Sequence, residues 1–176
     1  MGGRAALLHA CGFKNKWDAL VLISTHPGIE PENERSARRE ADRKLASEAL
    51  KLGAGAFIQR WQEHPLIQSQ KTIRPDWHTA MQATRKKHST NGLATSLLEF
   101  GQGSTPNLWP KLKQLRLPVL LLSGSLDKTY RNYAERMQIK LPNATHQSVE
   151  GAGHMPHLEK PEVTAEILKN FVKGLE

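Results

Sequence analysis

The stretch 118-PVLLLSGSLDKTY-130 decides the fold, because it places a buried strand directly before an acidic side chain. Residues 118–124 form a continuous apolar run, bounded by Pro118 and Gly124, of the kind found in parallel strands that are covered on both faces. Asp127 follows this strand, and the next helix is expected at about residues 130–141. Strands that alternate with helices predict a parallel α/β sheet.

A second strand that leads to a polar side chain is expected at 146-HQSVEGAGH-154, where a glycine-rich loop carries His154. The separation of 27 residues between Asp127 and His154 (154 − 127) leaves room for one helix and one strand. Ligands of open parallel sheets bind at the carboxyl ends of the strands, so both side chains point to one place. A carboxylate beside an imidazole forms the supporting half of a nucleophile–histidine–acid triad. We predict Asp127 and His154 as a catalytic pair; the alternative is a helix cap and an incidental histidine.

The rest of the chain divides into a core and an inserted segment. An apolar, β-branched run at 19–25 predicts a further buried strand, whereas residues 31–99 show charged helical patterns and no good strand candidate. We therefore predict an α/β core formed by residues 1–30 and 106–176, with a helical lid at residues 31–105, called the lid segment below. The other expected elements are a helix at 2–12, a polar loop at 13–18 and a final helix at 161–175.

Composition and charge exclude several classes of protein. The 176 residues are 38% apolar, and no apolar run approaches the roughly 18 residues that cross a membrane. A formal net charge of +8 favours an anionic partner, but the basic residues are not interleaved with stacking aromatics, so no nucleic acid is expected. The single Cys11 excludes an internal disulfide and, with no signal-peptide pattern at the N-terminus, indicates a cytoplasmic protein.

A metal site is not expected among the eight histidines. His154 and His157 form an H-x-x-H pair, but they lie in a loop that contains glycine and proline instead of on one face of a helix. No cysteine motif and no H-E-x-x-H motif supports them.

The first residues, 1-MGGRAALLHA-10, place glycines at the start of an apolar helix, where a strand usually delivers the chain into a tight turn. They match the second half of a nucleophile elbow, in which a G-x-S-x-G motif joins a strand to a helix and precedes the acid and the histidine. No G-x-S-x-G occurs in the 176 residues, and neither Ser104 nor Ser125 fits the motif. Cys11 lies about two helical turns too far along the chain to replace the serine.

Further stretches, spread over nearly the whole chain, carry a family resemblance. They are 1-MGGRAAL-7, 24-STHPGIE-30, 34-ERSARREADRKLA-46, 57-FIQRWQEHPLI-67, 84-TRKKHSTNGLATSL-97, 118-PVLLLSGSLDKTYR-131 and 151-GAGHMPHLEKP-161. Through them the chain resembles the MenH-type 2-succinyl-6-hydroxy-2,4-cyclohexadiene-1-carboxylate synthases of the α/β-hydrolase superfamily. The Asp and His motifs are general to that superfamily, whereas the arginine-rich helix and the RW pair before a proline narrow the resemblance to this branch.

The resemblance implies an α/β-hydrolase fold, with a partial parallel sheet and a helical lid insertion. It also implies a lyase that needs no metal or organic cofactor. A proton would be abstracted from a succinyl-enolpyruvyl-cyclohexene carboxylate and pyruvate would be eliminated, as a step in menaquinone or phylloquinone biosynthesis. Asp127 would hold the imidazole, and His154 would set the protonation state of the serine.

The resemblance further implies a set of substrate ligands. Arg4, Arg38 and Arg85 would bind the carboxylates of a small polycarboxylate substrate and the developing enolate, and Trp61 would line the pocket. Guanidinium groups pair bidentately with carboxylates, and preorganised positive charge stabilises a carbanion-like transition state. Structural roles remain as alternatives: Arg4 as an exposed helix residue and Trp61 as part of the lid core. Basic neighbours that compete for the roles of Arg38 and Arg85 are Arg35, Arg39, Arg43, Lys86 and Lys87.

The sequence departs from the family pattern at its start. The serine and the strand before it are absent, and the residue whose amide would be an oxyanion donor is Met1, with an ammonium at its nitrogen. Three strands without their neighbours would leave an apolar edge uncovered. We therefore expect a fragment that does not catalyse as it stands. Two alternatives stay open: another α/β-hydrolase (an esterase, thioesterase or carbon–carbon hydrolase), and a non-catalytic remnant that binds an anion. The oligomeric state is not predicted.

Overall fold

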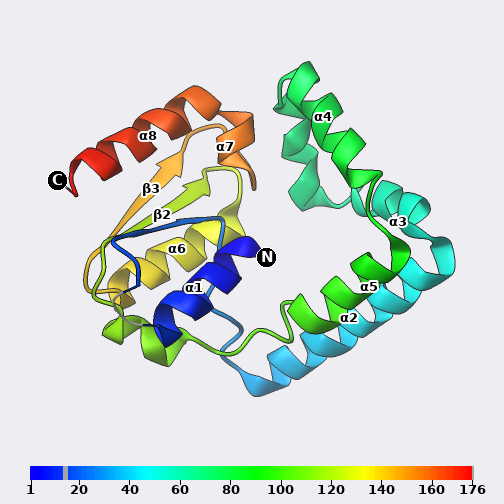
Figure 1. The fold of residues 1–176 in the computed structure, drawn as a ribbon, viewed down its shortest axis with the longest axis horizontal. Helices are drawn as coiled ribbons and strands as arrows, with labels where there is room; N and C mark the ends of the chain where they lie inside the picture. The colour runs from blue at the N-terminus through cyan, green and yellow to red at the C-terminus, as the bar shows by residue number, and fades with distance from the viewer. Residues whose placement is uncertain (14–15, 176) are drawn as a thin grey trace.

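The computed structural model describes residues 1–13 and 16–175, which form a three-stranded parallel sheet with helices around it (Figure 1). The strands are β1 (Leu20–Ile23), β2 (Val119–Gly124) and β3 (Ala144–Val149), in the order β1-β2-β3. Leu20 pairs with Val119, and Val119 in turn pairs with Ala144. The predicted parallel α/β arrangement is confirmed, and residues 14 and 15 of the predicted 13–18 loop lie outside the described residues.

Helices make up most of the remaining described chain. Two are 3-10 helices, and the others are α-helices. In chain order they are α1 (Gly2–Gly12), α2 (Glu32–Leu52), α3 (Ala54–Trp61), η1 (Pro65–Thr72), α4 (Pro75–Arg85), α5 (Thr90–Phe100), η2 (Trp109–Gln114), α6 (Lys128–Lys140), α7 (Pro156–Glu159) and α8 (Pro161–Lys173).

The hydrophobic core lies between the sheet and the helices α1, η2 and α6. All six residues of β2 are buried, as expected for a central parallel strand. Alternate side chains such as Val119 and Leu121 enter this core, where Leu7 of α1 and Met137 of α6 are fully buried. Helix α8 lies on the opposite face of the sheet (Figure 1).

The sheet is less completely covered at β1 and beneath α8. β1 is an edge strand of the described sheet, and its residues Val21 and Ile23 are partly exposed. A pocket of about 370 Å³ lies between the sheet and α8, where Leu120 faces Ile167 and Phe171 across it. Apolar surface therefore remains open at the places where a parallel sheet is normally covered.

Several predicted boundaries are wrong by a few residues. β3 begins at Ala144, two residues before the predicted start, and ends at Val149, whereas the glycine-rich loop predicted to follow it is confirmed. Gly151 has a φ of 67°, a left-handed conformation that breaks the strand and that glycine adopts without strain. The short helix α7 was not predicted, and the final helix ends at Lys173 instead of residue 175.

The lid segment is helical in its described residues, and no strand interrupts residues 31–105. Helices α2 and α5 pack side by side along their length (Figure 1). Glu32 and Glu34 in the first turn of α2 and Lys51 in its last turn are matched to the helix dipole, and Gly53, with a φ of 78°, ends the helix. The arrows of β2 and β3 point toward the side of the protein where the lid segment lies (Figure 1). None of the described helices is both long and apolar enough to cross a membrane.

Candidate active site

The loops that follow β2 and β3 are held together by backbone hydrogen bonds. The Leu126 amide donates to the Ala152 carbonyl at 2.9 Å, and the Gly151 amide donates to the Ser125 hydroxyl at 2.9 Å. The loop after β3 crosses so closely over Gly124 that a Cβ there would overlap the Ala152 and Gly153 carbonyl oxygens. Glycine at position 124 is therefore what allows the two loops to lie in contact.

These loops bring Asp127 and His154 into direct contact. Nδ1 of His154 lies 2.7 Å from Oδ2 of Asp127, and the Asp127 carboxyl is almost fully buried. The predicted proximity of the two side chains is confirmed, whereas their catalytic role stays a prediction. An ionised carboxylate can only accept, so Asp127 keeps the proton on Nδ1 and leaves Nε2 of His154 as a proton acceptor. About a quarter of the His154 side chain is exposed, so the imidazole is accessible from solvent.

Asp127 also has the role that was considered as an alternative. Its Oδ1 accepts a hydrogen bond from the Tyr130 amide at 3.1 Å, which caps the N-terminus of α6. The two carboxylate oxygens thus serve two partners, the helix and the imidazole. This double use fixes the carboxylate and through it the plane of the imidazole.

Tyr130, a partly buried tyrosine that was not predicted as a site residue, lies against the histidine. The Tyr130 and His154 rings meet edge to face with centroids 4.6 Å apart, and the Tyr130 hydroxyl accepts from Gln102 of the lid segment at 3.3 Å. Burial raises the pKa of the Tyr130 hydroxyl, which therefore stays protonated. Its position in the first turn after Asp127 was a usable signal, because that turn lies at the carboxyl end of β2.

His26, also missed as a candidate, lies just beyond the end of β1. It is buried, its Nδ1 accepts from the Gly28 amide at 3.2 Å, and its Nε2 has no partner among the described residues. Burial, assisted by the positive charge of Arg4, lowers the pKa of His26 to about 4. The ring centres of Tyr130 and Tyr133 lie 5.9 Å and 5.2 Å from that of His26. At neutral pH His26 is therefore an uncharged neighbour of these two tyrosines.

Arg4 is turned toward the lid segment and uses its guanidinium within the protein. It donates to the carbonyl oxygens of Phe100 at 2.7 Å and Gly101 at 2.9 Å, at the end of α5, and also to the Thr105 hydroxyl. The last carbonyls of a helix have no partner within the helix, and a cation near them is favourable. Arg4 is thus neither fully exposed nor free, and its role as a carboxylate ligand stays a prediction.

Arg38 differs from its basic neighbours because it pairs with a buried acid. Its Nε donates to Oδ1 of Asp42 at 2.8 Å, and the other oxygen of Asp42 accepts from the Gly103 amide at 3.0 Å. The competing arginines are occupied elsewhere: Arg35 pairs with Glu32, Arg43 pairs with Glu40, and Arg39 donates to the Gly103 carbonyl. Arg38 is therefore the arginine of this group whose guanidinium is held by a buried carboxylate. Its substrate role stays a prediction.

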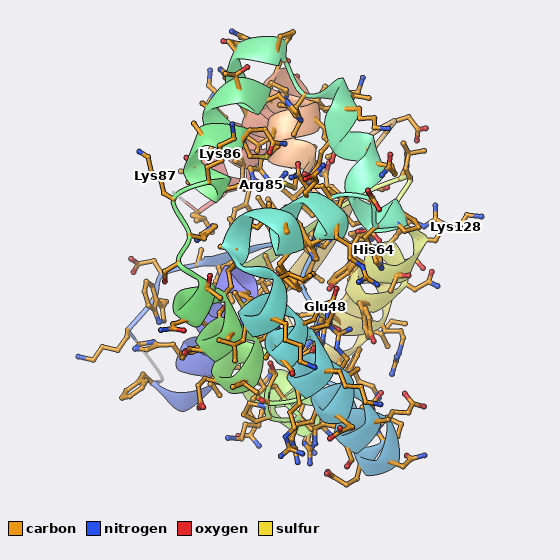
Figure 2. The ribbon with its side chains drawn as sticks, turned by 90° about the vertical axis from the view of Figure 1, so that its right-hand side faces the viewer. Glu48, His64, Arg85, Lys86, Lys87 and Lys128 are labelled. Carbon is orange, nitrogen blue, oxygen red and sulfur yellow. The ribbon has the colours of Figure 1, made fainter. Side chains whose placement is uncertain are left out.

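Arg85 and Trp61 lie together within the lid segment. The Arg85 guanidinium lies 5.4 Å from the centre of the Trp61 ring and donates to Gln70 at 2.7 Å. Burial lowers the pKa of Arg85. Figure 2 shows Lys87 projecting away from the protein, whereas Arg85, the last residue of α4, lies against the body of the lid segment. The structure thus separates Arg85 from Lys86 and Lys87, both of which are exposed; the ligand roles of Arg85 and Trp61 stay predictions.

Met1, the predicted oxyanion position, lies at the start of α1. Its carbonyl accepts from the Arg4 and Ala5 amides at 3.0 and 3.3 Å, which begins the helix. Gly3 in the first turn lies so close to the Thr25 side chain that a Cβ there would overlap the Thr25 hydroxyl. Gly3 is therefore required by the contact of α1 with the residues that follow β1, whereas a Cβ at Gly2 would meet no other group. The oxyanion role of Met1 stays a prediction.

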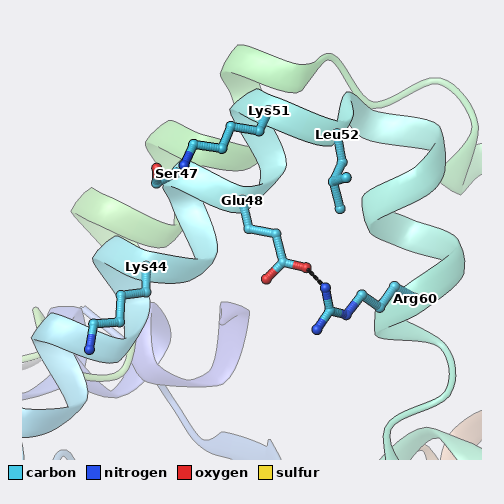
Figure 3. A pocket seen from close by; sticks show the side chains of 6 residues that line it. All are labelled: Lys44, Ser47, Glu48, Lys51, Leu52 and Arg60. Atoms are coloured by element: carbon cyan, nitrogen blue, oxygen red, sulfur yellow. Dashed lines mark ion pairs between the residues drawn. The ribbon is translucent and has the colours of Figure 1, made fainter.

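A pocket of about 370 Å³ lies in the angle between α2 and α3, and none of the core residues line it. Figure 3 shows Glu48 of α2 and Arg60 of α3 reaching toward each other across it, with an ion pair of 2.6 Å between them. Lys44 and Lys51 lie on the same wall as Glu48. Part of the positive charge of the lid segment thus lines a pocket that contains neither Asp127 nor His154. Among residues 1–13 and 16–175, no group of three or more His, Cys, Asp or Glu is arranged to hold a metal ion.

Comparisons with known proteins agree with this fold and these motifs. A family model described as "Alpha/beta hydrolase family" matches residues 1–167. A Bacillus subtilis relative named for 2-succinyl-6-hydroxy-2,4-cyclohexadiene-1-carboxylate synthase is 35% identical over 99% of this chain and 64% of its own length. The synthase of that name from Photorhabdus laumondii is 27% identical over 98% of this chain and 59% of its own length.

A solved structure gives the same result. The structure of MenH from S. aureus superposes with a TM-score of 0.94 and 31% identity, and covers 98% of this chain and 65% of that one. The resemblance and the fold predicted from the sequence motifs are confirmed. The chain spans less than two thirds of the length of each of these relatives.

Proposed function

The chain belongs to the alpha/beta hydrolase family, and within that family we propose that it serves the reaction for which the 2-succinyl-6-hydroxy-2,4-cyclohexadiene-1-carboxylate synthases are named. The reaction is an elimination of pyruvate from a succinyl-enolpyruvyl-cyclohexene carboxylate. A base removes a proton from the ring, a new carbon–carbon double bond forms, and the carbon–oxygen bond to the enolpyruvyl group breaks. The departing enolate takes up a proton and becomes pyruvate, so the elimination consumes and releases one proton. No oxidant, metal or organic cofactor enters this balance.

The observation that carries the proposal is the contact of 2.7 Å between Asp127 and His154 at the carboxyl ends of two neighbouring strands. A histidine whose Nδ1 proton is held by a buried carboxylate presents Nε2 as a base. In the role proposed here, His154 accepts the proton, directly or through a hydroxyl nucleophile, and Asp127 stabilises the imidazolium that results. The 35% identity to the B. subtilis relative supports the choice of reaction.

The lid segment, residues 31–105, is proposed to cover this pair and to supply the positive charge that a polycarboxylate needs. Arg38 and Arg85 are the proposed carboxylate ligands, and Trp61 is the proposed wall beside Arg85. Arg4 joins them if a substrate carboxylate replaces the Phe100 and Gly101 carbonyls that now accept from it. The expected cytoplasmic location belongs to the same proposal, supported by the single cysteine.

The first test is binding of the succinyl-enolpyruvyl-cyclohexene carboxylate to the 176-residue chain by isothermal titration calorimetry. We expect saturable binding that weakens as salt is added, because the attraction is partly electrostatic. Arg85→Gln should weaken it about tenfold through loss of a charge-assisted hydrogen bond. Lys87→Gln removes an exposed charge from the next turn and is the matched control, expected to leave the affinity almost unchanged.

The second test measures the release of pyruvate through a coupled reaction that reduces it. Release that disappears in His154→Ala would establish the elimination in this chain. Saturable binding without release would agree with the expectation that the chain does not catalyse as it stands, and would leave binding as the activity of these 176 residues. A chain that binds neither the substrate nor succinate would contradict both readings.

A further inference from the structure

Glu159, the last residue of the short helix α7, holds its carboxylate inside the protein and accepts three hydrogen bonds. Its side chain is buried, and Oε2 accepts from the Gly153 amide at 2.6 Å. Oε1 accepts from the Met155 amide at 3.0 Å and from the Ser69 hydroxyl at 3.1 Å. A buried carboxylate requires such donors, and three of them satisfy it without a cation.

Two of the three donors lie on either side of His154 in the chain. The amides of Gly153 and Met155 point to the same carboxylate, so the backbone that carries the imidazole is fixed both before and after His154. Asp127 fixes the tip of the same side chain at Nδ1. Glu159 therefore holds the backbone that carries His154, and Asp127 holds the orientation of the imidazole ring.

The third donor belongs to the lid segment. Ser69 lies on η1 and approaches the histidine loop so closely that a Cβ at Gly153 would overlap its hydroxyl. The adjacent Gln70 donates to the sulfur of Met155 at 3.1 Å and accepts from Arg85 at 2.7 Å. The lid segment is thus attached to the residues that flank His154, and a line of contacts leads from there to Arg85.

We propose that Glu159 is a positioning residue that sets the backbone around His154 and, through Ser69, makes the position of the imidazole depend on the docking of the lid segment. This inference rests on the proposed function in one respect, namely that His154 is the base. When the lid segment is docked, Ser69 binds Glu159, the imidazole of His154 is held in position, and Arg85 is linked to the same loop through Gln70. An undocked one releases Ser69 and leaves Glu159 with two donors instead of three.

The test compares Glu159→Gln, Ser69→Ala and the double variant by NMR on the labelled 176-residue chain. In Glu159→Gln, the amide NH₂ must face one of the two backbone N–H groups, whichever way it turns. We expect whichever of the Gly153 and Met155 amides loses its acceptor to exchange with solvent about tenfold faster, as for a lost hydrogen bond. The signal of the His154 Nδ1 proton should shift or broaden at the same time. Glu166→Gln, an exposed change on α8, is the matched control and should alter none of these signals.

The link to the lid segment is read from Ser69→Ala. This change leaves both backbone amides bound to Glu159, so their exchange should stay nearly constant, while amides of η1 exchange faster and the His154 signal moves part of the way. Because Ser69 acts through Glu159, the double variant should match Glu159→Gln alone. Additive effects on the His154 signal would overturn the coupling.

These signals are read without substrate, so the result is separable from the proposed function. An unchanged His154 signal in Glu159→Gln overturns the positioning role even if the substrate binds. A chain that binds no substrate contradicts the proposed function and leaves the NMR result intact. If Glu159→Gln does not fold, Ser69→Ala decides alone, and a His154 signal that stays unchanged in it overturns the inference. When turnover is measurable, the positioning role predicts a lower kcat with little change in KM for Glu159→Gln.

Discussion

Acidification should destabilise this protein through His26, the buried histidine at the end of β1. Burial is the main cause of its low pKa of about 4, and the charges of Arg4, Arg38 and the terminal amino group act in the same direction. The folded protein therefore holds His26 neutral at a pH where the unfolded chain, with a pKa of 6.5, binds a proton. The contribution of His26 to stability is fully present above about pH 6.5 and is lost as the pH falls toward 4.

The size of the effect follows from the two pKa values. A fall from 6.5 to about 4 corresponds to about 3 kcal/mol of unfolding free energy between pH 7 and pH 4. The structure supports so large a value because His26 is 2% exposed and no described residue could accept a hydrogen bond from Nε2 once it is protonated. This is a large part of the 5–15 kcal/mol by which domains are typically stable.

The assay is urea unfolding across this pH range for the unchanged chain and for His26→Asn. The asparagine oxygen can still accept from the Gly28 amide but does not titrate. The variant should be less stable at pH 7 by about 1–3 kcal/mol through lost packing. Acidification to pH 4 should move the difference by about 3 kcal/mol in favour of the variant, which then equals or exceeds the unchanged chain in stability. His88→Asn, at an exposed position, is the control and should follow the unchanged chain. Parallel curves for the unchanged chain and His26→Asn would refute the reasoning, because every other group titrates in both.

Two further predictions concern the loops that hold the pair. Asp127→Ala should be about 1 kcal/mol less stable than Asp127→Asn in urea unfolding, since only asparagine keeps an oxygen for the Tyr130 amide; equal stabilities would argue against the cap. Gly124→Ala should cost about 1–3 kcal/mol, because its Cβ would push the Ala152 carbonyl aside. A change below about 0.5 kcal/mol, the usual range for surface substitutions, would mean that the loop moves freely.

Much of the fold and part of the site could be read from local sequence. The apolar run at 118–124 became β2, and the run at 19–25 became the shorter β1, because burial on two faces selects such runs whatever surrounds them. Asp127 and His154 could be paired because the carboxyl ends of adjacent parallel strands always meet. β3 was placed less well, since its alternating exposure at the sheet edge gives a weak pattern.

Other parts of the site could not be predicted from sequence. The end of α5 accepts from Arg4 across 96 residues, and Glu159 accepts from Ser69 across 90. Neither contact has a local pattern, because a helix end or a buried carboxylate takes whichever donor the packing brings to it. Charge alone did not distinguish Arg38 from the neighbouring arginines of α2. Its pairing with Asp42 distinguishes it, and that carboxylate is buried only in the folded chain.

The sequence by itself therefore determined the class of sheet, the helical character of residues 31–105, the family and the proximity of Asp127 and His154, because each depends on patterns within a few residues. The tertiary structure alone decided which arginines are committed to protein partners, that His26 is buried with no partner for Nε2 among the described residues, and that Glu159 connects the lid segment to the loop that carries His154. These features depend on the desolvation and closeness of groups that are far apart in the chain, and neither quantity exists before the chain folds.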